Sequence, residues 1–369
     1  MNAFSILFAD SYDYNNSETN VLANNRTLAS IPFGGRYRLV DFVLSALVGA
    51  GIYDVGIVTR NKYNSLMEHV GWGKDWDLNR KNGGLKFLTP FQSGTGVVTN
   101  KIEALNSVID YIETALPEYC LLSDANIVTN IDLKQFMKYH EEKGADISFV
   151  YKRMSVEDPE LQVTLDNEGR LVDAILRKKG ETSEENLFLN MILLKKELLI
   201  NLIEKGMTYG WQSIKKNIIA NSFNEYKIYG FEATGYTTQI KTCEEFYQAN
   251  MDLLKKDVRF ELFHGVNPIL TRIKDSVPTM YGENANVTNS LVADGCKIDG
   301  TVENCIIFRD VVVKKDAVVK NSIIMQGTVI ENSAEVQCVI TDTDVLITEG
   351  KKLMGTETMP FMINKGKVI

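Results

Sequence analysis

Short apolar runs alternate with longer segments of helical periodicity over the first two thirds of the chain. The apolar runs have the length and composition of buried strands, and they occupy residues 3–9, 54–59, 119–123 and 146–151. Apolar residues at helical spacing occupy residues 38–51, 101–116 and 132–144, and Asp132 and Gly144 suit the two caps of the last segment. This order predicts an α/β domain with a parallel sheet that helices cover on both faces.

The final third has a different period. Every sixth position is aliphatic at Ile306, Val312, Val318, Ile324, Ile330 and Val336. An amphipathic helix repeats its apolar positions at three and four, and a strand repeats them at two, so neither explains this spacing. It is typical of a parallel β-helix whose aliphatic side chains stack inward, and we expect the coils to span about residues 285–350. A valine-rich antiparallel sandwich is the alternative.

These two patterns divide the chain into three parts. We expect an α/β domain at residues 1–250, a linker at 251–284 and a β-helix domain at 285–369. A length of 369 residues is enough for two ordinary domains.

Charge and composition exclude several classes of partner. The net charge is −8, which provides no basic surface for nucleic acid or for an anionic membrane. The N-terminal apolar run lacks a preceding basic region and is too short for a signal peptide or a membrane span. We therefore expect a cytoplasmic protein with neither kind of partner.

The cysteines and histidines do not predict a metal site. The five cysteines are odd in number and have neither CxxC pairing nor metal-ligand spacing to the three histidines, so we expect them to be buried as small apolar residues. His69, His140 and His264 have no acidic or thiol neighbour at ligand spacing, and we expect them to serve packing. No cofactor is expected.

Two stretches of sequence carry a family resemblance. Residues 30–42 (SIPFGGRYRLVDF) closely resemble a segment of the glucose-1-phosphate adenylyltransferases, also called ADP-glucose pyrophosphorylases. Residues 287–296, 300–304 and 319–327 are similar to that family's C-terminal repeats. The resemblance covers nearly the whole chain. It implies a Rossmann-like nucleotidyltransferase domain followed by a left-handed parallel β-helix, and the synthesis of ADP-glucose and pyrophosphate from ATP and glucose 1-phosphate.

That reaction requires backbone N–H groups and cations around the triphosphate, and carboxylates that hold Mg²⁺. The family's glycine-rich loop is replaced by residues 10–18 (DSYDYNNSE), where Asp10 and Asp13 add negative charge. The resemblance places Leu28 at the position of a phosphate-binding lysine. It places Ala125 and Gln239 at the positions of the two metal-binding aspartates.

Positive charge persists at two places where the family binds anions. The sugar-phosphate motif Glu-Lys-Pro aligns with residues 176–180, where Lys178 and Lys179 are the residual candidates, although a solvated turn explains them as well. Arg36 and Arg38 are candidates for binding an anionic sugar-phosphate effector, since two guanidinium groups suit a phosphate. Pairing of Arg38 with Asp41 at the start of a helix is the alternative.

The segments of the scaffold match the family, whereas the residues for phosphate and metal binding are replaced. In this the chain resembles the GlgD-type, noncatalytic or regulatory subunits of the family. The resemblance implies a hetero-oligomer, as a tetramer, with a catalytic homologue in bacterial glycogen biosynthesis. The alternative is an active or weakly active enzyme that holds Mg²⁺ through displaced carboxylates such as Asp10, Glu103 or Asp124. Acyltransferase chemistry, which uses a histidine between β-helix coils, has no base because no histidine follows His264.

Overall fold

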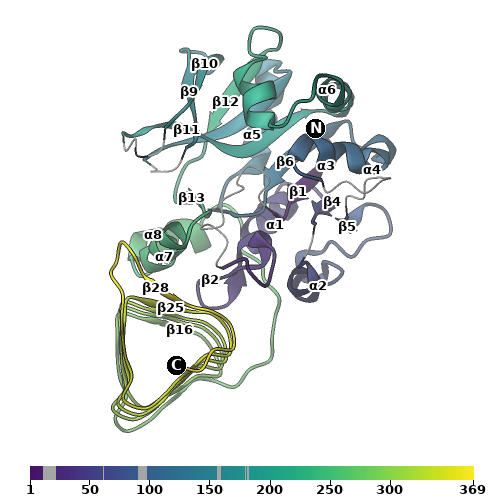
Figure 1. Ribbon diagram of the computed structural model, residues 1–369. Helices are drawn as coiled ribbons and strands as arrows, with labels where there is room; N and C mark the ends of the chain where they lie inside the picture. Colours follow the sequence, from purple (N-terminus) through teal and green to yellow (C-terminus); the bar gives the residue numbers. More distant parts are fainter. Residues whose placement is uncertain (11–21, 61, 90–97, 156–158, 179, 181–182) are drawn as a thin grey trace.

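A computed structural model describes residues 1–10, 22–60, 62–89, 98–155, 159–178, 180 and 183–369. An α/β domain is followed by a solenoid of triangular cross-section (Figure 1). The domain is built on a mixed sheet in which the described residues form nine strands. These strands are β1 (Ala3–Phe8), β4 (Asp54–Val58), β5 (Gly84–Leu88), β6 (Tyr119–Asp124), β8 (Ile147–Met154), β9 (Leu161–Leu165), β10 (Leu171–Leu176), β11 (Glu185–Lys195) and β12 (Ile228–Glu232).

The prediction of a wholly parallel sheet was wrong. Strands β6, β1, β4 and β5 are parallel neighbours, but β11 runs antiparallel to β6, β8 and β9. The chain contains no helix between β8 and β11 in the described residues, only the antiparallel pair β9 and β10. Parallel neighbours are usually joined by a crossover helix, and the connection from β8 to β11 has none in its described residues, so β11 can pair antiparallel with β8.

Helices cover both faces of this sheet, as predicted. On one face α3, α4 and α6 bury residues such as Ile102, Ile112 and Leu202, and on the other α1, α2 and α5 bury residues such as Val43, Leu66 and Phe136. The helices are α1 (Leu39–Gly49), α2 (Asn64–Val70), α3 (Lys101–Ser107), α4 (Ile109–Thr114), α5 (Leu133–Lys143) and α6 (Lys196–Tyr209). The shorter elements are η1 (Leu28–Ser30), η2 (Lys74–Trp76), the π-helical η3 (Ile214–Ala220), and the strand pairs β2 (Pro32–Phe33) with β3 (Tyr37–Arg38) and β7 (Ile127–Thr129) with β13 (Thr237–Gln239).

Helix ends show how far local sequence decides structure. Asp132 caps α5 by accepting a hydrogen bond from the backbone N–H of Gln135, and Gly144 ends it with a φ of 55°. Both caps are as predicted. The helix predicted at residues 101–116 is instead two helices that meet at Val108, whose φ of −118° interrupts the helical backbone.

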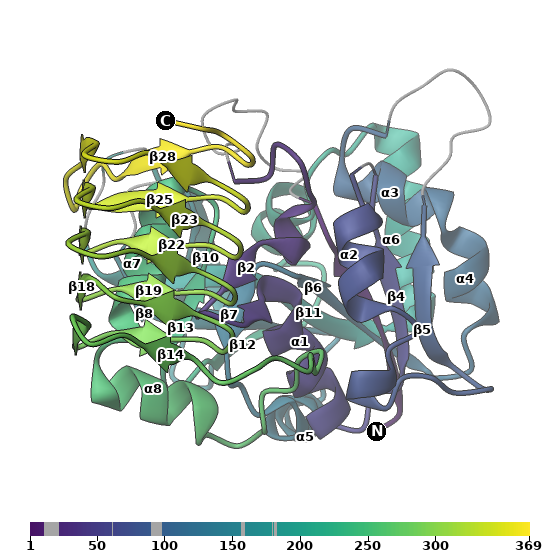
Figure 2. The same ribbon diagram turned by 90° about the horizontal axis from the view of Figure 1, so that it is seen from below.

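The C-terminal domain is a left-handed parallel β-helix, as predicted. Its strands form three five-stranded parallel sheets, one on each side of the triangle. Figure 2 shows the successive coils stacked on one another. The first sheet contains β14 (Met280–Tyr281), β17 (Lys297–Ile298), β20 (Val312–Val313), β23 (Val329–Ile330) and β26 (Leu346–Ile347). The second contains β15 (Asn286–Thr288), β18 (Thr301–Glu303), β21 (Val318–Lys320), β24 (Glu335–Gln337) and β27 (Lys352–Met354). The third contains β16 (Leu291–Val292), β19 (Ile306–Ile307), β22 (Ile323–Ile324), β25 (Val339–Thr341) and β28 (Phe361–Ile363).

Not every aliphatic residue in the six-residue series points inward. Val312 and Val318 are only partly buried, whereas their neighbours Val313 and Val319 fill the interior at 1% and 0% exposure. Val319 pairs with Val336, seventeen positions later, so a coil is one residue shorter than three hexapeptides and the inward phase drifts. Asn304 and Asn321 take left-handed backbone conformations at the turns, which asparagine tolerates better than most residues.

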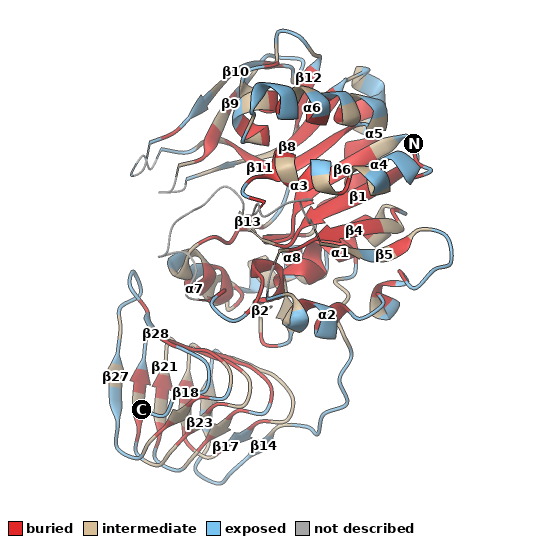
Figure 3. Cartoon of the chain, turned by 45° about the vertical axis from the view of Figure 1, so that its right-hand side comes forward, coloured by how far each residue is buried: buried red, intermediate tan, exposed pale blue. Residues whose placement is uncertain are grey.

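The range predicted as a linker contains regular structure. Helix α7 (Cys243–Asp252) ends inside it, α8 (Lys256–Phe263) follows, and β14 already pairs with β17. Leu253, Leu262 and residues of α7 pack in one cluster with Phe42 and with β-helix side chains such as Ile306, Ile323 and Ile340. These three isoleucines face the α/β domain, whereas their neighbours Ile307 and Ile324 belong to the cluster inside the solenoid. Figure 3 shows buried segments both in the α/β domain and in the solenoid. The two domains therefore share a hydrophobic junction.

Other expectations concern the cysteines and the membrane. All five cysteines are free, and all are buried except Cys243, which is partly buried. None of the described helices has the length and apolar character that a membrane span requires.

His140 predicts how stability depends on pH. Its ring is 2% exposed, and burial lowers the pKa of His140 to about 4. The unfolded chain therefore binds a proton below pH ~6.5 that the folded chain does not bind until about pH 4, and stability is lost as the pH falls through this window. Protonation of His140 should lower the free energy of unfolding by an amount on the order of 3 kcal/mol at pH 4, and His140→Gln should not show this decrease. Urea unfolding at several pH values measures it. If the free energy of unfolding fell equally with pH in the native protein and in His140→Gln, His140 would not be the group responsible.

Candidate functional site

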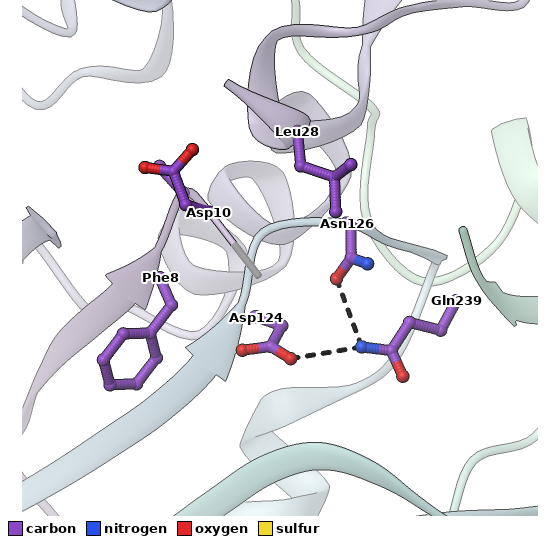
Figure 4. Close-up of a pocket in the computed structure, with 7 residues that line it drawn as sticks. Phe8, Asp10, Leu28, Asp124, Asn126 and Gln239 are labelled. Atoms are coloured by element: carbon purple, nitrogen blue, oxygen red, sulfur yellow. Dashed lines mark hydrogen bonds between the residues drawn. The ribbon is translucent and has the colours of Figure 1, made fainter. Parts of the chain in front are cut away.

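A small hollow lies where parallel strands β1 and β6 end, the edge at which open α/β sheets bind ligands. Leu28 and Gln239, which the family resemblance places at two functional positions, both line it (Figure 4). The lining residues are Phe8, Ala9, Asp10, Leu28, Asp124, Asn126 and Gln239. The structure therefore brings together several positions that sequence comparison had placed at one phosphate-binding centre.

Ala125 is not part of this hollow. Its side chain is fully buried in the core on the α1 face of the sheet, and its N–H donates to the carbonyl of Phe8. The carboxylate that faces the hollow belongs to Asp124, one position earlier. Asp124 ends β6 and Ala125 follows it directly, so one side chain reaches the hollow and the next one the core.

The Asp124 carboxylate is already engaged on both oxygens. The Lys101 ammonium, at the first residue of α3, lies 2.7 Å from Asp124 Oδ1, and both side chains are about nine-tenths buried or more. Gln239 Nε2 donates to Asp124 Oδ2 and to Asn126 Oδ1, each at 3.2 Å, as the dashed lines in Figure 4 show. A lysine thus supplies the positive charge beside this carboxylate.

Asn190 completes the network and was missed by sequence reasoning. Its Nδ2 donates to Gln239 Oε1 at 3.3 Å, and the residue is buried. Asn190 has a φ of 55° within β11, where the pairing with β8 shifts register. Such a bulge re-aims a side chain, but no sequence pattern signalled it.

Asp10 contributes a second acid to the hollow. Its Oδ2 accepts hydrogen bonds from the Arg60 N–H at 3.0 Å and the Thr59 hydroxyl at 3.4 Å. Burial outweighs these bonds and raises the pKa of Asp10. A polyphosphate would meet this acid where it needs donors. The rest of the replaced glycine loop, including Asp13, lies outside the described residues.

Of the three carboxylates proposed as displaced metal ligands, Asp10 and Asp124 line the hollow and Glu103 does not. Glu103 accepts hydrogen bonds from Thr99 at the start of α3 and does not line the hollow. Within the described ranges, no group of three His, Cys, Asp or Glu side chains could hold a metal ion. Since Mg²⁺ requires oxygen ligands and Asp124 is occupied by an ammonium group, the residues present do not fit that ion.

The two candidate effector arginines have different surroundings. Arg36 is exposed and lies over the Tyr37 ring, 5.1 Å from its centroid. Arg38 is partly buried, and its Nη1 donates to the Ser65 carbonyl at 2.8 Å and to the Ser65 hydroxyl at 2.6 Å. Only the backbone N–H of Arg38 donates to Asp41. The carboxylate of Asp41 instead contacts His69 Nε2 at 2.7 Å, an acidic partner that sequence spacing did not reveal.

Arg38 belongs to a basic cluster at the domain junction, which we define as Arg26, Arg38, Arg272, Lys274 and Arg309. Burial, followed by the charge of Arg26, lowers the pKa of Arg38 to about 10. Burial, followed by the charges of Arg309, Arg38 and Arg272, lowers the pKa of Lys274. Asp342 and Asp294 partly balance the cluster through ion pairs with Arg26 and Arg309. Its members come from both domains, so local sequence did not reveal them.

Of the two sugar-phosphate candidates, Lys178 and Lys179, only Lys178 lies within the described residues. Lys178 is exposed beyond the end of β10, and Lys179 lies outside the described residues. The neighbouring Arg177 is 3% exposed, and its N–H donates to the carbonyl of Glu160 at 2.9 Å.

This fold and this hollow define a nucleotidyltransferase-type domain joined to a hexapeptide β-helix. The family model "Nucleotidyl transferase" matches residues 22–173, and the model "GlmU-like, C-terminal hexapeptide" matches residues 276–358. The chain belongs to the glucose-1-phosphate adenylyltransferase family, in the part that includes the GlgD proteins.

Individual relatives support that assignment over nearly the full length. "Glycogen biosynthesis protein GlgD" of Bacillus subtilis strain 168 is 34% identical over 94% of this chain and 92% of the relative. The protein of the same name from Geobacillus stearothermophilus is 36% identical over the same shares. A glucose-1-phosphate adenylyltransferase of Clostridium botulinum strain Eklund 17B is 32% identical over 81% of this chain and 79% of the relative.

Proposed function

We propose that this chain is a regulatory, largely noncatalytic subunit that assembles with a catalytic glucose-1-phosphate adenylyltransferase in bacterial glycogen biosynthesis. The GlgD and adenylyltransferase relatives support the role in glycogen biosynthesis. The observation that carries the noncatalytic part is the Lys101–Asp124 ion pair in the hollow, where catalysis would need carboxylates free to bind a metal. We further propose a cytoplasmic location and a hetero-tetramer.

The basic cluster supports a regulatory role. It joins the catalytic-type domain to the β-helix, so an anion bound there would contact both domains. Arg38 and Arg272 also hold α2, because Arg38 donates to Ser65 and Arg272 donates to the carbonyl of Glu68. An anionic sugar phosphate would compete for these guanidinium groups and could shift α2, which gives a binding event two structural states to act on.

Coexpression tests this proposal. The chain and the catalytic homologue from the same cell should elute together at the size of a tetramer, and the mixture should need a different sugar-phosphate concentration for half-maximal activity than the homologue alone. In that mixture Arg38→Met should raise the half-maximal concentration about tenfold, the loss of one charge-assisted contact, and the exposed Arg36→Met should raise it less. Separate elution with unchanged activation constants would refute the regulatory role.

A second candidate function is a weak adenylyltransferase. It is favoured by one observation, that Asp124 faces the hollow from the end of β6. In that case Mg²⁺ would have to displace Lys101 from the carboxylate.

A further inference from the structure

A second group of buried charges belongs neither to the lining of the hollow nor to the basic cluster. Glu160, Lys215 and Lys241 are exposed by only 2%, 5% and 5%. Glu160 precedes β9, Lys215 lies in the π-helical η3, and Lys241 follows β13. Three segments distant in sequence therefore bring one carboxylate and two ammonium groups to one buried place.

Each oxygen of the Glu160 carboxylate has its own lysine. Lys215 Nζ lies 3.0 Å from Oε2, and Lys241 Nζ contacts Oε1. Buried ammonium groups are costly unless an anion satisfies them, and a carboxylate held by one cation on each oxygen reproduces how proteins hold a free anion. The arrangement is that of an anion-binding site whose anion is attached to the chain.

Regular structure and backbone hydrogen bonds fix the three segments that carry this group. Lys241 is held by its own backbone, because its N–H donates to Glu245 Oε2 at 2.7 Å in the cap of α7. Lys215 is carried by a π-helix, a rare conformation that is frequent at functional sites. The N–H of Arg177 fixes the backbone of Glu160, next to the segment that carries Lys178.

We propose that Glu160 is an internal ligand that fills a two-lysine site for a carboxylate or phosphate group. The site of the native chain is thereby closed to free anions and ordered without a ligand. This goes beyond the regulatory proposal and does not depend on any partner.

The test removes the attached anion and supplies a free one. Glu160→Ala deletes a fragment equivalent to acetate and should lower the thermal midpoint by about 10 °C, since it leaves two buried cations without this carboxylate. Sodium acetate at about 100 mM should then restore about 3–5 °C relative to sodium chloride of equal ionic strength. Inorganic phosphate, tested in the same way, should also stabilise Glu160→Ala more than it stabilises the native chain.

Two controls separate this site from binding elsewhere. Glu160→Gln loses the same charge but leaves no space, so acetate should not restore it. Glu160→Ala combined with Lys215→Met keeps the space but loses one cation, so its gain should fall by at least half. The proposal would be overturned if acetate did not raise the thermal midpoint of Glu160→Ala above its value in chloride. It would also be overturned if acetate raised the midpoint of either control by as much. If Glu160→Ala does not accumulate, Glu160→Ser provides the same space, and failure of both to fold even when produced with acetate counts against the proposal as well. None of these outcomes depends on oligomer formation, so they are independent of the regulatory proposal.

Discussion

The purified chain is expected to release pyrophosphate from ATP and glucose 1-phosphate at least ~10³-fold more slowly than a catalytic homologue at saturating Mg²⁺. Loss of one preorganised charge commonly costs 10²- to 10³-fold in rate, and several such elements are altered here. Gln239 is a neutral amide, Asp124 is paired with Lys101, and the side chain of Leu28 has neither a charge nor a hydrogen-bond donor for a phosphate. A coupled pyrophosphate assay with each protein alone measures this ratio.

Asp124→Asn is the matched control for this prediction, because it keeps the shape of the side chain. If the chain has no metal-dependent chemistry, any residual rate should be the same in the native protein and in this variant. A residual rate that falls with Asp124→Asn and rises with Lys101→Met would instead support the weak enzyme. A native rate within tenfold of the homologue would refute the noncatalytic assignment.

Local patterns predicted the β-helix and the principal strands well because their signals are repetitive. Six aliphatic positions at fixed spacing define a solenoid, yet the drift that turns Val312 and Val318 outward depends on the length of the turns between faces. The antiparallel direction of β11 was not predicted. Its eleven residues have the composition of any buried strand, and that composition does not reveal the direction in which the strand pairs. Helix α8 was missed because its stability comes from packing at the junction.

The candidate site was predictable in composition but not in contacts. The family resemblance assigned Gln239 and Leu28 to altered positions of one site, and both line the hollow. It could not show that Ala125 turns into the core while Asp124 turns outward, because this depends on the backbone where β6 ends. Lys101, Asn190 and the junction cations Arg272 and Lys274 come from separate segments, and only the folded chain brings them to their partners.

Arg26→Met is expected to destabilise the protein by about 3–5 kcal/mol, the cost of leaving a buried charge without its partner. Arg26 Nη2 lies 2.6 Å from Asp342 Oδ1, with side-chain exposures of 6% and 3%. The pair joins the segment before η1 to the β-helix, so the loss should fall on the junction between the domains. Urea unfolding followed by circular dichroism measures it.

The reason for so large an effect is the environment of Asp342. Without Arg26, its carboxylate retains the N–H of Thr343 at 2.7 Å but loses its buried cation. The β-helix supplies a matched control in Lys320, which pairs with Glu303 at 2.8 Å with exposures of 45% and 41%. Lys320→Met should cost less than about 1 kcal/mol, because water screens an exposed pair. Similar losses in the two variants would mean that Arg26–Asp342 does not hold the junction, whereas a selective loss with Arg26→Met would place this ion pair among the contacts that fix one domain on the other.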